Sequence, residues 1–259
     1  SKIFLNKNIK PYNFYKEGFN KLSLLGYQGI GLYSLAALDI GFWDAYSKSA
    51  NVPLAELLGG TINPVKAYNS KGLWLIPPEK IEQEVNELLE DNNFNALKVR
   101  IGRKNLSEDI NVINKIKKIG GENLKLMSDF NQCFDYNSAL ERMLNLDDLG
   151  LYWFEEPVNF RDYTSCFKLS SKINTPITIG ENFHGTYDLI TSIEKKASSL
   201  IMPDLMRIGG VSGWIKAANI AEAFNLKLST HLFPEVSAHL LNISPTADWL
   251  EWVDWAEPI

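Results

Sequence analysis

Short apolar runs alternate with longer amphipathic stretches along the chain from residue 65 onward. The first run, 65–70, is followed by a stretch at 78–92 whose apolar residues recur at helical spacing, and then by the run 96–102. This alternation continues toward the C-terminus, with eight apolar runs that begin near residues 65, 96, 124, 151, 176, 199, 226 and 249. Each run predicts a strand, and the stretches between them predict helices.

The alternation predicts a parallel sheet, because parallel neighbours need a crossover connection, which is usually a helix. Eight such units close naturally into a (β/α)8-type TIM barrel. A doubly wound open sheet is the alternative, but it normally has a Gly-rich phosphate-binding turn after its first strand, and AYNSKG (67–72) is not one. The sequence therefore favours the barrel.

Residues 1–60 follow a different pattern. Within 22–60, apolar residues such as Leu35, Ile40 and Trp43 recur at helical spacing, and the stretch ends at Gly59 and Gly60. We interpret 1–60 as helices that pack beside a barrel formed by 61–259.

Composition narrows the classes of partner. The chain has 259 residues, with 26 Lys and Arg against 31 Asp and Glu, for a formal net charge of −5. Nucleic acids and anionic membranes call for clustered positive charge, so this mildly acidic balance argues against both as partners. We expect a small-molecule ligand.

The number of cysteines and the length of the longest apolar stretch indicate in which cellular compartment the protein is expected. Cys133 and Cys166 are too few for a disulfide scaffold or a thiolate metal site, which favours a cytoplasmic protein. The longest apolar stretch, around 29–43, contains polar residues and is too short to span a bilayer, so we expect no membrane helix.

Polar residues stand at the ends of most predicted strands. Active sites of (β/α) barrels lie at the carboxyl ends of the strands, so these side chains are expected to face one site. They are Lys98, Arg100, Asp129, Asn131, Glu155, Glu181, Asp204, His231 and Glu251.

Three of these residues are carboxylates that follow consecutive strands. Asp129, Glu155 and Glu181 are spaced by 26 residues each. Neighbouring strands would place them side by side, where like charges raise one another's pKa unless a cation lies between them. All-oxygen ligation with room for water and substrate suits Mg²⁺. A single carboxylate would be an ordinary solvated acid, but the matched positions favour a metal site.

The remaining polar residues suit acid–base chemistry. Lys98 and Arg100 alternate along one strand, so we expect both to point into the barrel, across from the carboxylates, and to reach one substrate. His231 is a candidate proton-transfer group that Asp204 would orient through one ring nitrogen. The other two histidines of the chain are expected to be structural.

A series of short motifs connects these residues. In order they are KVRIG (98–102), DFNQ (129–132), FEEP (154–157), IGEN (179–182), MPDLMRIGGVSGW (202–214), STHLF (229–233) and SPTA (244–247). In order and spacing they resemble the mandelate racemase and muconate lactonizing enzyme group of the enolase superfamily, and the resemblance runs from about residue 10 to the end of the chain. It implies a modified (β/α)7β barrel with part of an α+β capping domain.

The resemblance also implies a metal site and a chemistry. Asp129, Glu155 and Glu181 would ligate Mg²⁺, which binds the substrate carboxylate, and Lys98 would contact the same carboxylate. Members of this superfamily remove a proton next to a carboxylate with a Lys or His base and stabilise the product with Mg²⁺. Glu156 is expected to be no more than a neighbour of the ligands.

The resemblance also implies roles for the other site residues. His231 with Asp204 would be an acid–base arm, and a protonated Glu251 would donate a hydrogen bond to the enolate oxygen. Asn131 and Ser70 are the expected further substrate contacts.

One position departs from the family pattern. Mandelate racemase has a second lysine as its other base where this chain has Arg100. A guanidinium is normally protonated, so a two-base racemase is disfavoured. We rank first the dehydration of a sugar acid, an aldonate or aldarate, to a 2-keto-3-deoxy acid. The alternatives are racemisation or epimerisation of a 2-hydroxy acid, and a catalytically silent metal-binding homologue.

The resemblance has two further implications. Family members carry a complete capping domain, which chooses the substrate, whereas this chain has only part of its helical section in residues 1–60. The sequence therefore does not name the acid. The family also forms symmetric homo-oligomers, so we expect one here.

Overall fold

Parallel strands form the frame of the molecule. The computed structural model describes residues 10–26, 28–90 and 94–254. Its strands are β1 (Ala67–Asn69), β2 (Ala96–Arg100), β3 (Lys125–Asp129), β4 (Phe154–Glu155), β5 (Ile177–Ile179), β6 (Leu200–Ile201), β7 (Lys227–Leu228) and β8 (Leu250–Trp252). They pair in parallel in the order β7-β6-β5-β4-β3-β2-β1-β8. The predicted strands and their parallel arrangement are confirmed.

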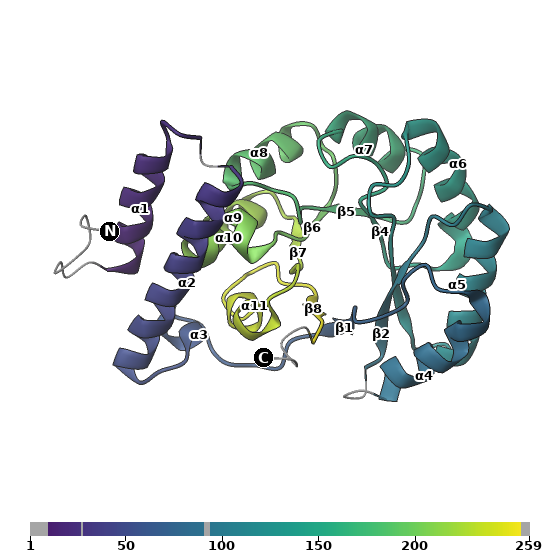
Figure 1. Cartoon of the computed structure of the whole chain (residues 1–259), viewed down its shortest axis with the longest axis horizontal. Helices are drawn as coiled ribbons and strands as arrows, with labels where there is room; N and C mark the ends of the chain where they lie inside the picture. Colours follow the sequence, from purple (N-terminus) through teal and green to yellow (C-terminus); the bar gives the residue numbers. More distant parts are fainter. Residues whose placement is uncertain (1–9, 27, 91–93, 255–259) are drawn as a thin grey trace.

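The sheet curls until its two end strands meet (Figure 1). Between β7 and the segment leading into β8, the Leu228 N–H donates to the Thr246 carbonyl and the Asp248 N–H donates to the Leu228 carbonyl, each at 2.9 Å. The Thr230 N–H donates to the Trp249 carbonyl at 3.0 Å. These backbone bonds close the ring, and the predicted barrel is confirmed.

Helices connect the strands and surround the barrel (Figure 1). They are η1 (Pro78–Lys80), α4 (Ile81–Glu90), α5 (Leu106–Gly120), α6 (Tyr136–Leu146), η3 (Asp147–Leu149), α7 (Tyr163–Ser170), α8 (Thr186–Glu194), α9 (Leu205–Ile208), α10 (Gly210–Ala223) and α11 (Pro234–Leu241). Most strands therefore connect to the next through at least one helix, as parallel pairing requires.

Helix α5 illustrates why these stretches are helical. Its buried residues Val112, Ile113 and Ile116 lie on one face, as the helical period requires. Acidic residues in its first turn and lysines in its last turn complement the helix dipole. Gly121, at φ 73°, ends the helix in a conformation that glycine adopts without a steric penalty.

A layer of large apolar side chains fills the barrel beneath the strand ends. It is a buried cluster of Tyr68, Ala96, Met127, Trp153, Leu200 and Trp249. Side chains two positions apart on a strand point the same way, so the residue two positions after Trp153, which is Glu155, lies on the same inner face. This layer forms the floor on which the polar strand ends stand.

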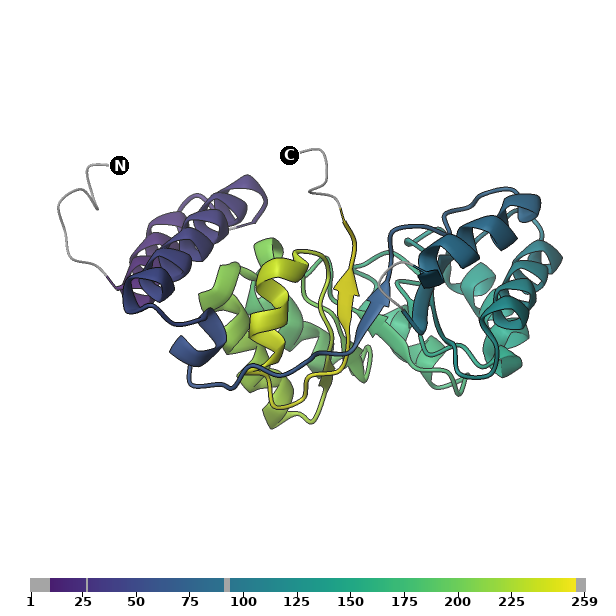
Figure 2. The ribbon, with the colours of Figure 1, turned by 90° about the horizontal axis from the view of Figure 1, so that it is seen from below.

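The N-terminal helices α1 (Pro11–Leu22), α2 (Ile30–Ala50) and α3 (Leu54–Leu57) lie at one end of the molecule, next to α9, α10 and α11 (Figures 1 and 2). Asp39 of α2 is fully buried and accepts hydrogen bonds from the N–H and hydroxyl of Ser212 at 2.8 and 2.7 Å. The Trp43 indole N–H donates to the same hydroxyl at 2.9 Å. The described part of residues 1–60 is therefore helical and packs beside the barrel, whereas residues 1–9 and 27 lie outside the described residues and the division into two domains after residue 60 stays a prediction.

Within the described ranges, no helix combines the length and the hydrophobicity needed to cross a bilayer.

Candidate active site

Strand register brings two of the predicted metal ligands together. Asp129 ends β3 and is paired with Glu155, which ends β4. Glu181 follows the end of β5, the next strand in the sheet. Asp129 and Glu155 are 1% and 0% exposed, so both carboxylates lie out of water on neighbouring strands.

Lys98 lies among the carboxylates. Its Nζ is 2.7 Å from Glu251 Oε1, 3.0 Å from Glu155 Oε1 and 3.5 Å from Asp129 Oδ2. The expectation that Lys98 faces the carboxylates from across the barrel is therefore wrong. The reason is strand order, because β2 is paired directly with β3, next to β4.

One ammonium group faces three buried carboxylates, so the cluster carries surplus negative charge. Burial alone would lower the pKa of Lys98, but the neighbouring carboxylates outweigh it and hold that pKa above its usual value. Burial and the charge of Asp129 raise the pKa of Glu155 well above its usual value, more than Lys98 lowers it. A further cation would relieve this repulsion.

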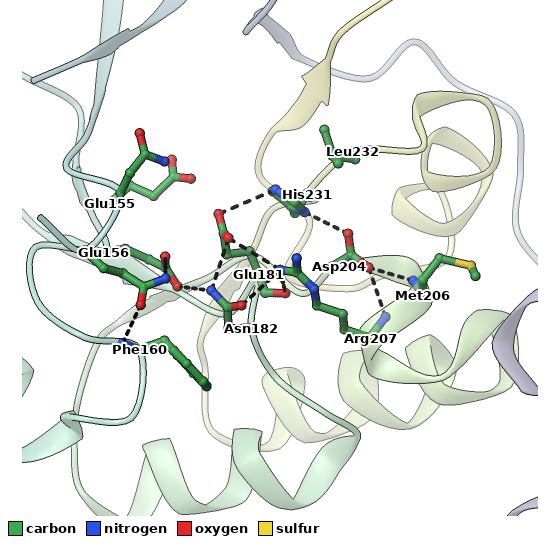
Figure 3. A network of polar contacts seen from close by, with 12 residues as sticks. Glu155, Glu156, Phe160, Glu181, Asn182, Asp204, Met206, Arg207, His231 and Leu232 are labelled. Carbon is green, nitrogen blue, oxygen red and sulfur yellow. Dashed lines mark hydrogen bonds and ion pairs between the residues drawn. The ribbon is translucent and has the colours of Figure 1, made fainter. Parts of the chain in front are cut away.

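The third predicted ligand, Glu181, has other partners (Figure 3). Its Oε1 is 3.4 Å from Arg207 Nη1, and its Oε2 is 3.5 Å from His231 Nε2. Across the described ranges, no three Asp, Glu, His or Cys side chains already converge as a coordination sphere. The carboxylates have the donor type and charge that suit a divalent cation, but they turn toward cationic groups of the chain.

His231 and Asp204 form the predicted pair. His231 Nδ1 lies 2.8 Å from Asp204 Oδ2. The other oxygen of Asp204 accepts hydrogen bonds from the N–H groups of Met206 and Arg207, both at 2.9 Å, which fixes the carboxylate at the start of α9 (Figure 3). Burial alone would lower the pKa of His231, but the bond to Asp204 and the nearby carboxylates raise it to about 9.

Glu251 differs from the expectation of a protonated acid. It is 1% exposed, and its Oε2 accepts a hydrogen bond from the Leu232 N–H at 3.0 Å. Burial alone would raise the pKa of Glu251, but Lys98 and His231 hold it well below its usual value. Glu251 is therefore charged in this arrangement, because an ammonium group lies beside it.

Arg100 binds the loop that follows β1. Its Nη1 donates to the carbonyls of Ser70 and Gly72 at 3.1 and 3.2 Å, and its Nη2 donates to Ser70 Oγ at 3.1 Å. The guanidinium lies over the Trp74 ring, 4.2 Å from its centroid. Arg100 Nε is buried with no hydrogen-bond partner among the described residues, 3.9 Å from Asp129 Oδ2. The guanidinium fork is thus occupied by the backbone, and Ser70 lies against it.

Asn131 lies against a predicted metal ligand. Its Nδ2 donates to Asp129 Oδ2 at 3.0 Å, and its N–H donates to Asp129 Oδ1 at 2.8 Å. Asn131 has a positive φ of 45°, in the left-handed region that asparagine tolerates better than most residues. Asn131 orients Asp129, and its contact with substrate stays a prediction.

Sequence reasoning missed the polar network around Glu156. Glu156 is 2% exposed and accepts hydrogen bonds from Gln132 Nε2 at 2.6 Å and Asn182 Nδ2 at 2.7 Å. Burial and the charge of Glu181 raise the pKa of Glu156 to about 8. Gln132 and Asn182 belong to the motifs DFNQ and IGEN, but spacing alone does not show which side chains face each other.

Comparisons with known proteins place these features in a family context. A family profile described as enolase C-terminal domain-like matches residues 80–258. L-talarate/galactarate dehydratase from Salmonella typhimurium is 30% identical over 91% of this chain, and the chain spans 59% of that enzyme's length.

Two solved structures are also similar. An enolase from alpha proteobacterium BAL199 with bound magnesium superposes with a TM-score of 0.94 and 42% identity, covering 96% of this chain and 69% of that one. An enolase from Bradyrhizobium complexed with magnesium and mandelic acid gives a TM-score of 0.90 and 35% identity, covering 95% of this chain and 68% of that one.

Proposed function

The chain belongs to the mandelate racemase and muconate lactonizing enzyme group of the enolase superfamily, and on that premise we propose that it dehydrates a sugar acid. The product would be a 2-keto-3-deoxy acid. The observation that carries this proposal is a site with one acid–base arm, His231 held by Asp204, and with an Arg100 whose fork is bound to the loop after β1.

Mg²⁺ is the proposed cofactor. Asp129, Glu155 and Glu181 would hold it, because they follow adjacent strands and the surplus charge around Glu155 calls for a cation. When bound, Mg²⁺ stabilises the negative charge that develops on the carboxylate oxygens of the substrate. The similar structure from alpha proteobacterium BAL199 contains magnesium, which supports this assignment.

His231 is the proposed proton-transfer residue. Asp204 accepts from Nδ1, so in the neutral form of His231, which its raised pKa makes the minor form at pH 7, Nε2 is the ring nitrogen that takes the proton α to the carboxylate. The C–H electron pair first moves toward the carboxylate, which gives an enolate, and then forms the bond between Cα and Cβ while the C–O bond to the β-hydroxyl breaks. His231 returns the proton to the departing hydroxide, which leaves as water, and the enol converts to the ketone.

Lys98 and Glu251 support this chemistry by charge. Lys98 stays protonated and donates to the substrate carboxylate, which is the role expected of it. Glu251 holds the Lys98 ammonium at 2.7 Å and accepts a hydrogen bond from the Leu232 N–H, so it orients Lys98 and the backbone next to His231.

Arg100 favours dehydration over two-base racemisation. A second base would need a side chain that can give up a proton at neutral pH, and a guanidinium is normally protonated. The contacts of Arg100 with Ser70 and Gly72 also engage three of its N–H groups in holding the loop after β1.

A racemase or epimerase of a 2-hydroxy acid is the second candidate. It is favoured by the similarity to the Bradyrhizobium structure, which was solved with mandelic acid. This candidate predicts that configuration at the α-carbon inverts without loss of water.

Substrate, assembly and location complete the proposal. A small carboxylate substrate is supported by the similar talarate/galactarate dehydratase. We also propose a homo-oligomer, which family membership supports. A cytoplasmic location is supported by the free cysteines Cys133 and Cys166.

A ketone assay with a panel of acids tests the proposal. The protein is incubated with Mg²⁺ and with aldonic acids, aldaric acids or mandelate, and the 2-keto product is trapped as its semicarbazone. Product from a sugar acid that disappears with EDTA supports dehydration. Inversion of mandelate or of a sugar acid at the α-carbon, without ketone, would favour the racemase or epimerase over the dehydratase. Bound Mg²⁺ without any reaction across the panel would contradict both candidate functions.

A further inference from the structure

Arg207 connects the predicted metal ligand Glu181 to the rest of the protein (Figure 3). Its Nη1 donates to the Glu181 carbonyl at 2.8 Å and to Asn182 Oδ1 at 3.1 Å, and it lies 3.4 Å from Glu181 Oε1. The guanidinium therefore contacts both the backbone carbonyl and the side-chain carboxylate of Glu181. Glu181 Oε2 points instead toward His231.

A tyrosine of the N-terminal helices accepts a hydrogen bond from Arg207 on the side of the guanidinium away from Glu181. Arg207 Nε donates to the Tyr33 hydroxyl at 3.2 Å. The same hydroxyl lies 3.4 Å from His184 Nε2, and the two rings stack with centroids 6.0 Å apart. Tyr33 of α2 thus contacts both the loop after β5, through His184, and helix α9 after β6, through Arg207.

The position of Tyr33 is fixed by the packing of α2. Six residues further along this helix, Asp39 is buried and bonded to Ser212 of α10. Trp43, on the same helix, donates to the Ser212 hydroxyl. Because α2 is anchored in this way, the Tyr33 hydroxyl is a stationary acceptor for Arg207.

His184 completes the support. Its ring Nδ1 lies 3.0 Å from the Asn182 carbonyl, and its backbone N–H donates to Asp188 Oδ2 at 2.9 Å. The ring is therefore held on the side away from Tyr33, which fits the structural role expected for this histidine. Tyr33 meets Arg207 on one side and a fixed ring on the other.

We propose that Tyr33 is a positioning residue that sets the affinity for Mg²⁺ from helix α2, by fixing Arg207 and through it the carboxylate of Glu181. The inference rests on the proposed function, in which Glu181 is a ligand. Partners that orient a ligand through hydrogen bonds affect metal affinity although they never touch the metal. Without the hydroxyl, Arg207 Nε loses its acceptor, and the contacts of Nη1 with Glu181 and Asn182 hold the guanidinium less firmly.

The test measures Mg²⁺ affinity by titration calorimetry, without substrate. Tyr33→Phe keeps the ring and removes the hydroxyl, and we expect its dissociation constant to rise roughly 10-fold. Tyr12→Phe is the matched control, because Tyr12 belongs to α1 and is 49% exposed, and it should bind Mg²⁺ like the wild type. Thermal unfolding in EDTA should be the same for both variants and the wild type.

A double-mutant cycle separates positioning from a general structural role. In an Arg207→Met background, Tyr33→Phe should have no further effect on the dissociation constant, because its route to Glu181 is gone. Three results would overturn the inference. They are an Mg²⁺ affinity of Tyr33→Phe equal to that of the wild type, additive effects of the two substitutions in the cycle, and a lower unfolding temperature of Tyr33→Phe than of the wild type in EDTA.

Glu181→Gln distinguishes the two proposals. If it leaves Mg²⁺ affinity unchanged, the metal assignment itself fails, and this inference with it. If Glu181→Gln weakens binding but Tyr33→Phe does not, the proposed metal site stands and only the role of Tyr33 is overturned.

Discussion

At the residue scale, Lys98 and Arg100 receive different tasks although they lie two positions apart on β2. Lys98 meets carboxylates, whereas Arg100 meets the carbonyls and hydroxyl of the loop after β1. A compact ammonium suits a cluster of anions, and a planar guanidinium fork suits several acceptors at once. Neither cation is arranged as a base, which agrees with the proposed proton transfer by His231.

Arg100→Lys tests whether the guanidinium fork holds the loop. A lysine cannot reproduce the donors that reach Ser70 and Gly72, so buried acceptors lose their partners. We expect the free energy of unfolding to fall by about 1–3 kcal/mol, measured by urea denaturation. Arg161→Lys is the matched control at an exposed position and should unfold like the wild type. Equal stability of all three proteins would contradict the anchoring role.

At the element scale, two arginines hold the segment between β1 and η1. Arg100 donates to the carbonyls of Ser70 and Gly72, and Arg103 donates to those of Trp74 and Ile76 at 3.4 and 3.1 Å. Arg103 is in turn paired with Asp109, which is fully buried. The loop beside the site is therefore fixed by side chains from β2 and the segment after it.

The contact between α2 and α10 makes stability depend on pH. Burial raises the pKa of Asp39 to about 6, against 3.8 for an ordinary aspartate, although hydrogen bonds from Ser212 lower it. The unfolded chain releases this proton near pH 4, whereas the folded chain keeps it until about pH 6. The folded state therefore binds more protons in this window, and its stability falls as pH rises from 4 to 6.

Asp39→Asn isolates this contribution. The amide does not titrate, so the free energy of unfolding of the wild type should fall relative to Asp39→Asn by about 2 kcal/mol between pH 4 and pH 6. Urea denaturation at a series of pH values measures the difference. A difference that stays constant across the window would show that Asp39 does not titrate there.

At the scale of the whole molecule, strand order accounts for what the sequence predicts well. Strands and helices alternate with a clear periodicity, and residues at strand ends must share one rim, so Asp129 and Glu155 are found together. The pairing of His231 with Asp204 follows from two adjacent strand ends in the same way. These predictions depend on the backbone arrangement and need no knowledge of side-chain direction.

The contacts that the sequence did not predict depend on the direction in which long side chains point. Lys98 turns toward the carboxylates and Arg100 toward the loop, although both stand on the same inner face of β2. Tyr33 reaches Arg207 across 174 positions of sequence, and no periodic pattern reports that contact. The charge of Glu251 likewise follows from the ammonium beside it.

Proton NMR in D₂O is the measurement that tests the central claim most directly. The wild type and His231→Asn are each incubated with an accepted sugar acid, with Mg²⁺ and then with EDTA. We predict that the wild type with Mg²⁺ removes the α-proton signal and forms the 2-keto-3-deoxy product, and that EDTA stops both. His231→Asn should lose roughly 10²–10⁴-fold in rate while still binding Mg²⁺. Wild-type rates in His231→Asn, or in EDTA, would contradict Mg²⁺-dependent proton abstraction by His231.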